Sequence, residues 1–445
     1  MKYVIIGGVA AGMSAAMEIY RTDDSANITV LERGQDYSYG QCGLPYVVND
    51  LISSTDKVIA RTVEDFRNKY QINARTNTIV IDVNVDHQEV VAIDTVTNEE
   101  FTVAYDRLLI ATGADPIKPN WDGIDLAGIH TFKTITDTNN LLSDLTDDVK
   151  QVTVIGAGYI GLELADALKS RGLDVRLIQR EDQVAEIFDR DMAVLVQNEA
   201  EKQGIEIILE ETVKGFSGND RVEAVMTDKQ TYPTDLVLLA IGVKPNTEFL
   251  NDTGIHKLPN GALIVNAYQE TSIKHIYAAG DCATQYHRIK QQHDYIPLGT
   301  TANKQGRIAG ANMAGRRIAF KGVVGSSIIK FFDLSLGRTG LNENEAKQLN
   351  LPYTIISSVA NSHAGYYPGA EKLNLRLIYH TETKQLLGGQ IIGKKGVDKR
   401  IDVLATALYA ELTMSQLLDL DLSYAPPYNG AWDPIQQLVR KSGLG

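Results

Sequence analysis

The sequence predicts an α/β protein with two Rossmann-like nucleotide-binding domains and a C-terminal α+β domain. A strand, glycine turn, helix and strand follow one another twice, near residue 7 and again near residue 156. The character of the sequence then changes to an α+β mixture after about residue 322. At 445 residues, the chain is long enough for three domains of roughly 150 residues each.

Composition excludes several classes of protein. The chain is 44% hydrophobic and 22% charged, which is typical of globular proteins. Its net charge of -13 repels phosphate backbones and anionic membranes, so we expect no nucleic-acid and no membrane partner. Apolar runs are too short to span a membrane, no signal peptide is apparent, and the 2 cysteines fit a reducing compartment, so we expect a cytoplasmic protein.

The first strand–turn–helix–strand unit begins at the N-terminus. Strands are predicted at residues 3–6 and 28–31, with a helix between them. The turn is glycine-rich, with Gly7, Gly8 and Gly12. It is degenerate, because Val9 stands where the middle glycine of a dinucleotide motif belongs. Glu32 follows the second strand, where a carboxylate accepts from ribose hydroxyls or is simply an exposed strand-end residue.

The second unit carries a complete G-x-G-x-x-G motif between strands at residues 152–155 and 175–178. Its glycines are Gly156, Gly158 and Gly161. The position at the end of the second strand is Gln179, followed by Arg180. A neutral side chain beside a guanidinium suits the 2′-phosphate of NADPH, and use of NADH as well stays open. The alternative is that Arg180 is simply solvated and does not contact the nucleotide.

Cys42 is the candidate redox residue. It lies in Tyr39-Gly-Gln-Cys-Gly-Leu-Pro-Tyr46, and the following Leu-Pro pair suits the first turn of a helix. We therefore expect Cys42 at a helix N-terminus, where the dipole favours the thiolate; the alternative is an inert core thiol. Cys282 is expected to be structural.

Together these motifs resemble those of the pyridine nucleotide-disulfide oxidoreductases, in particular the single-cysteine branch typified by bacterial coenzyme A-disulfide reductases. The resemblance covers essentially the whole chain and includes Ala111-Thr-Gly113, Gly242-Val-Lys-Pro-Asn246, His363-Ala-Gly-Tyr-Tyr-Pro-Gly369 and Tyr424-Ala-Pro-Pro-Tyr428. It implies a glutathione reductase-like fold and a homodimer. In this arrangement residues 1–113 and 245–321 bind FAD, residues 114–244 bind NAD(P)H, and residues 322–445 form the dimerisation domain.

The resemblance implies NAD(P)H-dependent reduction of coenzyme A (CoA) disulfide through a Cys42–S–S–CoA mixed disulfide. Electrons pass from the nicotinamide through FAD to this mixed disulfide, which releases CoA thiol, and Cys42 then attacks the next CoA disulfide. Tyr366 and Tyr424 match two tyrosines that the second subunit brings to the cysteine to protonate or stabilise the leaving thiolate. By sequence alone, tyrosines in such aromatic and Pro-rich segments are more often packing residues.

Other activities of the family are weighed by single positions. Val47 stands at the place of the second cysteine of a C-x4-C pair, which excludes an internal disulfide there. Ala10 replaces the histidine of the oxidase and peroxidase branch, so oxygen or peroxide chemistry is a runner-up. Reduction of polysulfide or CoA persulfide needs the same cysteine and flavin and stays open, as does a sensor whose Cys42 only stores CoA.

Further contacts are implied by the resemblance. Cofactor contacts are expected at Arg33, Thr112, Gly113, Tyr159, Gly242, Asp281, Leu298 and Thr300. Tyr159 is expected to gate the nicotinamide side of the flavin or to be a surface tyrosine, and Asp281 to accept from FAD or to cap a helix. CoA contacts are expected at Arg21, Ser38, Gln41 and Lys69, with Arg21 equally a helix-end cation. No metal is expected.

Overall fold

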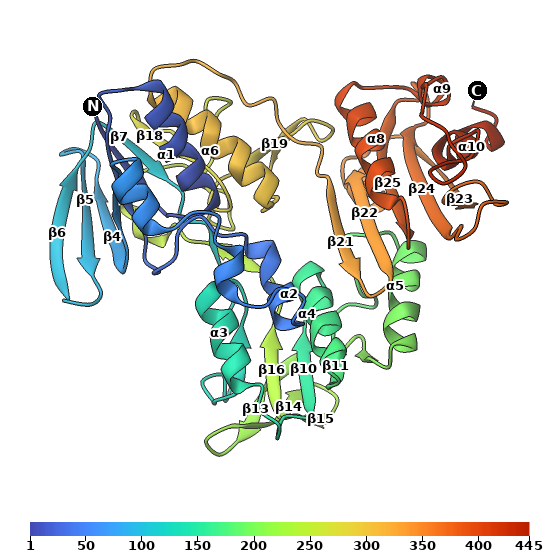
Figure 1. Ribbon diagram of the computed structural model, residues 1–445, viewed down its shortest axis with the longest axis horizontal. Coiled ribbons are helices and arrows are strands. Elements are labelled where there is room, and N and C mark those ends of the chain that lie inside the picture. Colours follow the sequence, from blue (N-terminus) through green and yellow to red (C-terminus); the bar gives the residue numbers. More distant parts are fainter. Residues whose placement is uncertain (445) are drawn as a thin grey trace.

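The computed structural model describes residues 1–444 and confirms the predicted fold class (Figure 1). Two parallel sheets and one antiparallel sheet, each of five strands, form three lobes that are separated in the view of Figure 1. The first sheet, at the blue end of the chain, also receives a strand from the yellow part of the chain. The N-terminal lobe is therefore built from two separate stretches of sequence.

The first sheet is parallel throughout, in the order β18-β7-β1-β2-β3. Its strands are β1 (Lys2–Ile6), β2 (Asn27–Leu31), β3 (Asn73–Arg75), β7 (Arg107–Ile110) and β18 (Ile276–Ala278). Side chains of a strand alternate between the two faces, so Tyr3 and Ile5 pack with the helices while Val4 and Ile6 pack on the opposite face. Both faces are covered, which explains the continuous apolar run in β1.

Helices α1 (Ala10–Thr22) and α6 (Gly299–Met313) cover one face of this sheet. They cross closely, because a Cβ on Gly306 would lie 2.1 Å from the carbonyl oxygen of Ala11. The opposite face carries a small antiparallel sheet formed by β4 (Thr78–Asn84), β5 (Glu89–Asp94) and β6 (Glu99–Ala104). Close packing of α6 on α1 brings a helix from late in the chain beside the first glycine turn.

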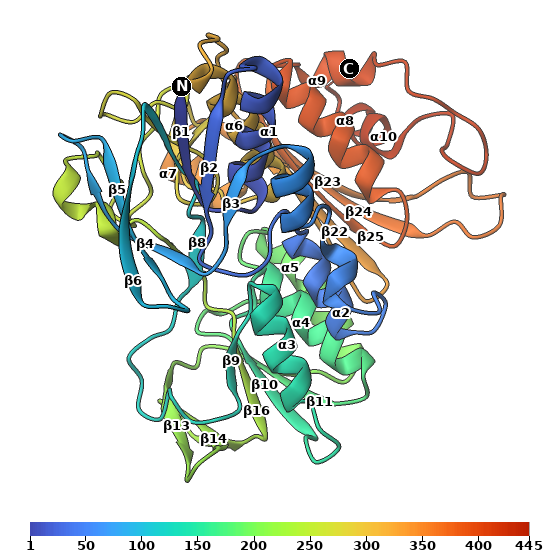
Figure 2. The same ribbon diagram turned by 60° about the vertical axis from the view of Figure 1, so that its left-hand side comes forward.

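The second parallel sheet repeats this layering in the order β12-β11-β10-β16-β9. Its strands are β9 (Ile129–Thr131), β10 (Gln151–Ile155), β11 (Asp174–Ile178), β12 (Glu206–Ile208) and β16 (Leu236–Leu239). Three helices pack on one face: α3 (Ile135–Asp144), α4 (Tyr159–Ser170) and α5 (Arg190–Lys202). An antiparallel sheet covers the other: β13 (Val213–Gly218), β14 (Val222–Thr227) and β15 (Thr231–Pro233). Figure 2 shows this lobe below the first.

Short elements connect the lobes and complete the first one. The strands β8 (Ala114–Pro116) and β17 (Val243–Pro245) pair antiparallel where the chain passes into and out of the second lobe. Between β2 and β3 lie a 3₁₀ turn (Gln41–Gly43), α2 (Leu44–Val48), a second 3₁₀ turn (Thr55–Val58) and a π turn (Asp65–Lys69). A 3₁₀ turn (Glu248–Thr253) and the hairpin β19 (Gln285–His287) and β20 (Gln292–Asp294) come later.

The C-terminal lobe is built on an antiparallel sheet in the order β21-β22-β25-β24-β23. The strands are β21 (Ser327–Phe331), β22 (Leu334–Gly340), β23 (Tyr353–Asn361), β24 (Lys372–His380) and β25 (Leu386–Gly393). The helices are α7 (Glu343–Gln348), α8 (Val397–Tyr409), α9 (Met414–Leu418) and α10 (Pro434–Lys441). The middle strand β25 is buried along its whole length, because α8 packs against one face and Ile392 on the other face joins the core of the second lobe.

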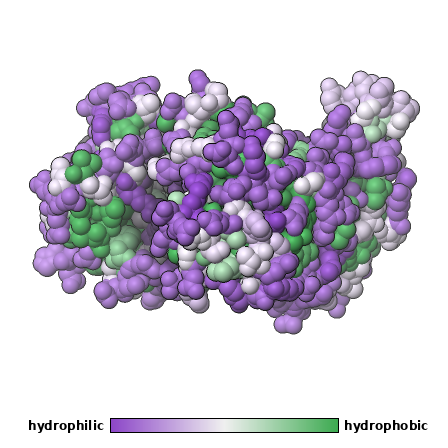
Figure 3. Space-filling view, turned by 90° about the horizontal axis from the view of Figure 1, so that it is seen from below, coloured by the Kyte–Doolittle hydropathy of each residue, from purple (hydrophilic) through white to green (hydrophobic). Residues whose placement is uncertain are grey.

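The surface agrees with the composition. Figure 3 shows a largely hydrophilic face on which apolar side chains form only separate patches. Within residues 1–444, no helix is long and apolar enough to cross a membrane.

Candidate functional site

Both predicted glycine turns form the same tight structure between a strand and a helix. A Cβ on Gly12 would lie 1.9 Å from the carbonyl oxygen of Gly7, and one on Gly161 would lie 1.9 Å from that of Gly156. No side chain caps the N-terminus of α1 or of α4. Free amides beside a turn without side chains fit the pyrophosphate of a dinucleotide, so both turns can hold one.

Glu32 lies directly against the first turn. One carboxylate oxygen accepts from the amide of Gly8 at 2.6 Å, and the other accepts from the amide of Gly34 at 2.8 Å. A carboxylate has about four acceptor positions, so about two remain for ligand hydroxyls. This geometry fits the ribose of an adenine dinucleotide such as FAD.

Gln179 takes the corresponding place in the second turn, but a carboxylate that was not predicted, that of Glu181, contacts both Gln179 and Arg180. Its amide oxygen accepts from the amide of Ala157 at 2.8 Å, and its amide nitrogen donates to Glu181 at 2.7 Å. Arg180 also pairs with Glu181. Glu181 follows Arg180 directly but was not among the residues predicted from the sequence. The guanidinium expected to hold a 2′-phosphate is already paired with a carboxylate.

Cys42 lies in the 3₁₀ turn that leads into α2, and Pro45 occupies the first turn of that helix as predicted. The thiol is exposed, unlike that of Cys282, which is buried and donates to the carbonyl of Ile110 at 3.3 Å. Loss of hydration raises the pKa of Cys42, which is opposite to the direction expected from a helix dipole. Cys42 precedes α2 as predicted, but that helix has only 5 residues.

Charged groups from three distant segments surround Cys42. The carboxylates of Glu163 and Asp281 raise its pKa further, while Lys133 lowers it. Lys133 binds Asp281 at 3.0 Å, with both side chains mostly buried. No helix begins at Asp281, so its alternative role as a helix cap is wrong; the residue starts a turn. Neither Lys133 nor Glu163 was among the residues predicted from the sequence, because both lie far from Cys42 in the chain.

The other expected cofactor residues lie around the first turn and the crossover between lobes. Arg33 binds Asp115 at 2.6 Å, and the Thr112 hydroxyl donates to the carbonyl of Asn246 at 2.7 Å. Gly113 and Gly242 both have positive φ, at 66° and 114°. Leu298 precedes the first residue of α6, and no side chain caps that helix. Thr300, in its first turn, is exposed.

Tyr159 opens α4 and reaches the C-terminal lobe. Its hydroxyl is hydrogen-bonded to that of Ser327 in β21. Burial raises its pKa. The alternative prediction of an exposed surface tyrosine is therefore wrong, because the side chain is half-buried and hydrogen-bonded to the C-terminal lobe.

The residues expected to contact CoA lie between β2 and β3 and at the end of α1. Arg21 pairs with Glu18 at 3.6 Å and stays largely exposed. Ser38 and Gln41 lie on the segment that leads to Cys42. Lys69 lies over the ring of Tyr70 at 5.4 Å, and Arg61 lies over the same ring at 5.7 Å. Arg61 and Tyr70 were not predicted from the sequence; together with Lys69 they form a cationic aromatic surface.

Tyr366 and Tyr424 come together on the C-terminal lobe although 58 residues separate them. Their hydroxyl oxygens are 2.9 Å apart. Both side chains are exposed, at 75% and 49%. The pair is thus directed to solvent in a single protomer.

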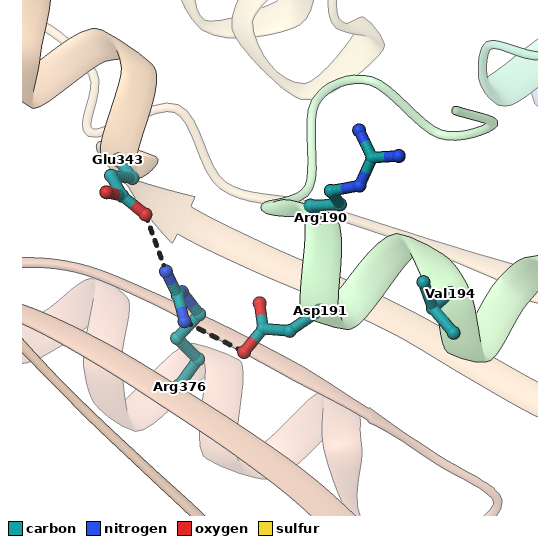
Figure 4. A pocket seen from close by; sticks show the side chains of 5 residues that line it. All are labelled: Arg190, Asp191, Val194, Glu343 and Arg376. Carbon is teal, nitrogen blue, oxygen red and sulfur yellow. Dashed lines mark hydrogen bonds and ion pairs between the residues drawn. The ribbon is translucent and has the colours of Figure 1, made fainter. Parts of the chain in front are cut away.

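A separate surface pocket lies between α5 and the C-terminal sheet (Figure 4). Its lining residues are Arg190, Asp191, Val194, Glu343 and Arg376, none of which belongs to the expected site. Arg376 binds Asp189 at 2.6 Å and both Asp191 and Glu343 at 2.8 Å. Arg376 is thus already paired with three carboxylates, and its ion pairs with Asp189 and Asp191 connect the third lobe to the second.

Comparison with known proteins identifies the family. Residues 1–306 match the model of the pyridine nucleotide-disulphide oxidoreductases, and residues 326–434 match their dimerisation domain. Coenzyme A disulfide reductase of Staphylococcus aureus is 34% identical over 443 residues, covering 99% of both chains. A protein named NADH oxidase, from Methanocaldococcus jannaschii, is 37% identical over 437 residues, covering 98% of this chain and 97% of its own.

A solved structure gives the same answer. The NAD-dependent persulfide reductase from A. fulgidus superposes with a TM-score of 0.97 at 36% identity, covering 100% of this chain and 83% of its own. The resemblance drawn from the sequence motifs is confirmed. The chain therefore belongs to the pyridine nucleotide-disulphide oxidoreductase family and is a flavin-dependent NAD(P)H oxidoreductase.

Proposed function

We propose that this protein is a homodimeric NAD(P)H-dependent reductase of CoA disulfide. The observation that carries the proposal is the exposed Cys42 thiol, since the only other cysteine, Cys282, is fully buried. A disulfide formed at Cys42 therefore takes its second sulfur from a substrate. The similarity to a CoA disulfide reductase over 99% of the chain supports CoA as that substrate.

The proposed reaction consumes one NAD(P)H and one proton for each CoA disulfide and releases two CoA thiols. The Cys42 thiolate attacks one sulfur of CoA disulfide, which breaks that S–S bond, forms Cys42–S–S–CoA and expels one CoA thiolate. FAD, held by the first turn and Glu32, supplies the two-electron chemistry that returns Cys42 to the thiolate and frees the second CoA. Lys133 is the cation that opposes the two carboxylates beside the sulfur.

CoA carries phosphates, and the chain offers cations near the segment of Cys42 to bind them. Lys69, Arg61 and Tyr70 present charge and an aromatic face together. Arg21, Ser38 and Gln41 complete the proposed CoA site. Tyr366 and Tyr424 from the partner protomer are proposed to protonate or stabilise the leaving thiolate.

We assign FAD to residues 1–113 and 245–321, NAD(P)H to residues 114–244, and the dimer interface to residues 322–445. NADPH is the proposed reductant, with NADH also accepted, because Arg180 favours a 2′-phosphate while Glu181 opposes it.

A second candidate substrate is polysulfide or a CoA persulfide. It is favoured by the similarity to a persulfide reductase at 36% identity, and it uses the same exposed thiol. An oxidase activity has the support of the relative named NADH oxidase, but Ala10 offers no imidazole at the first turn.

The test is anaerobic multiple-turnover oxidation of NADPH with CoA disulfide and, separately, with polysulfide. The wild type is compared with Cys42→Ser and with Cys282→Ala, which removes the buried thiol. We expect turnover of CoA disulfide that disappears in Cys42→Ser but persists in Cys282→Ala. Turnover of polysulfide alone would move the substrate to sulfur reduction, and full activity of an FAD-loaded Cys42→Ser would refute the thiol cycle.

A further inference from the structure

The tyrosine pair lies on two loops that need a scaffold. Tyr366 is in the loop between β23 and β24, and Tyr424 is in the segment before α10. Apart from the contact between the two hydroxyls, neither side chain is buried by its own protomer. The separation of the hydroxyls therefore depends on what holds the two loops together.

Arg400 of α8 lies beneath both loops and is 1% exposed. Its guanidinium donates to the carbonyl of Ser362 at 2.9 Å, which anchors the first loop, and to the Asn429 side chain at 3.1 Å, which anchors the second. It also binds Asp433 at 3.0 Å, the residue that caps α10. One buried side chain thus joins both tyrosine loops to two helices.

Asn429 extends this connection and is 2% exposed. Its amide nitrogen donates to the carbonyl of Ser423 at 3.2 Å, next to Tyr424. Its backbone carbonyl accepts from the amide of Ala364 at 3.1 Å, two residues before Tyr366. Asn429 is therefore the direct link between the loops.

A buried ion pair is an expensive way to obtain stability. Removing both charges from water costs several kcal/mol per ion, and apolar replacements of similar volume are often equally stable. The guanidinium of Arg400 does what an apolar side chain cannot do, because its planar donors fix the direction and distance of several acceptors at once. The hydrogen bonds of Arg400 therefore fix the relative position of the two loops that carry Tyr366 and Tyr424.

We propose that Arg400 and Asn429 are positioning residues that set the separation of the Tyr366 and Tyr424 hydroxyls. This inference rests on the proposed function, in which the partner's pair acts on the thiolate leaving Cys42. Neither Arg400 nor Asn429 touches the reacting atoms. They act through the two loops.

Asn429→Ala is the informative variant, because it keeps the Arg400–Asp433 pair, whereas a substitution of Arg400 leaves Asp433 buried without its cation. Asn312→Ala is the matched control. Asn312 is also a buried asparagine with three side-chain hydrogen bonds, but it lies in α6. Both variants are made as FAD-loaded enzyme, alone and combined with Tyr366→Phe and Tyr424→Phe.

We expect Asn429→Ala to lower kcat with CoA disulfide by about tenfold to a hundredfold. The rate of flavin reduction by NADPH should stay within about twofold, since the tyrosines serve only the sulfur half of the cycle. In the background of the double phenylalanine variant, Asn429→Ala should lower kcat no further. Asn312→Ala should leave both rates near those of the wild type.

An unchanged kcat in Asn429→Ala overturns the inference. The same is true if the loss persists in the double phenylalanine background, because the effect then does not pass through the tyrosines. A wild type that turns over neither CoA disulfide nor polysulfide refutes the proposed function, and the inference with it. The two failures are distinguished by the wild type: it is inactive if the proposed function is wrong, and it turns over CoA disulfide if only the role of Asn429 is wrong.

Discussion

The two strand–turn–helix–strand units of this chain share a backbone and differ in their side chains. In both units the third glycine packs onto the carbonyl of the first, with a Cβ-to-oxygen distance of 1.9 Å for Gly12 and for Gly161. In both, a strand-end side chain accepts from a turn amide, Glu32 at 2.6 Å and Gln179 at 2.8 Å. A side chain that ends the second strand therefore orients the turn, whatever its charge.

The difference lies in what each side chain leaves for the ligand. Glu32 places its carboxylate at the first turn, whereas the second turn has the amide of Gln179 there and the nearby carboxylate is that of Glu181, which pairs with Arg180. Backbone geometry builds a site for a dinucleotide, and the few side chains around it decide which dinucleotide is bound.

The largest expected effect comes from adding a methyl group to the last glycine of each glycine turn. Gly12→Ala should yield protein depleted of FAD, while Gly161→Ala should keep FAD and lose reduction by NADPH, since the added methyl would have to displace a backbone carbonyl. Overpacking of about 1–3 kcal/mol corresponds to binding weakened by about fivefold to a hundredfold. The flavin-to-protein absorbance ratio and stopped-flow flavin reduction measure the two losses.

Gly158 provides the steric control for these variants. A Cβ there meets nothing within 4 Å, so Gly158→Ala should melt at the wild-type temperature. Loss of FAD from Gly161→Ala, or of reduction by NADPH alone from Gly12→Ala, would show that the two units are not assigned as proposed.

A smaller effect is expected where the two units diverge. Glu181→Ser frees Arg180 and removes a carboxylate that repels the 2′-phosphate of NADPH. The ratio of kcat/KM for NADPH to that for NADH should rise by about tenfold, the value of one charge-assisted hydrogen bond. Steady-state kinetics with both nicotinamides give the ratio.

Asp182→Ser is the matched control, because it also removes a neighbouring carboxylate, but one that pairs with Arg190. An equal shift in both variants would indicate a general effect of charge. No shift in Glu181→Ser would mean that Arg180 does not reach the nucleotide.

Local patterns predicted most of this architecture, and contacts distant in sequence account for what they missed. Both glycine turns and the strand-end residues Glu32 and Gln179 follow from periodicity and spacing over about thirty residues. The pair of Lys133 and Asp281 joins residues 148 apart, so no local pattern carries it. Glu163, which adds to the effect of lost hydration in raising the pKa of Cys42, comes from the second lobe, so no pattern around Cys42 reveals it either.

The strands β4–β6 were not predicted, although β4 and β5 alternate between buried and more exposed residues, as strands do when only one face is covered. The tyrosine pair followed from a family resemblance, whereas the network of Arg400 beneath it did not. Arg400, Asp433 and Asn429 come from α8, the cap of α10 and a loop, and only the folded lobe brings them together. Sequence patterns reveal glycine turns well because a turn is local, and they reveal polar networks poorly.

The smallest expected effect concerns the second residue after the last glycine of each turn, which is Ser14 in α1 and Glu163 in α4. Burial, with a contribution from Asp166, raises the pKa of Glu163 from 4.5 to about 7. Below pH 4.5 the carboxyl is neutral in both the folded and the unfolded chain and does not alter stability. Between the two pKa values, 4.5 and about 7, Glu163 loses its proton in the unfolded chain but keeps it in the folded chain. The free energy of unfolding therefore falls as the pH rises to about 7.

Glu163→Gln should therefore match the melting temperature of the wild type at pH 4.5 and exceed it above pH 7. Partial exposure reduces the gain to about 1–2 kcal/mol, or about 1–2 °C for a chain of this size. Melting curves of the FAD-loaded enzyme across this range measure the difference, with the exposed Glu64→Gln as control. A gain in melting temperature that is equal at pH 4.5 and pH 8 would come from packing. It would refute the prediction that ionisation of Glu163 destabilises α4 in a way that Ser14 does not destabilise α1.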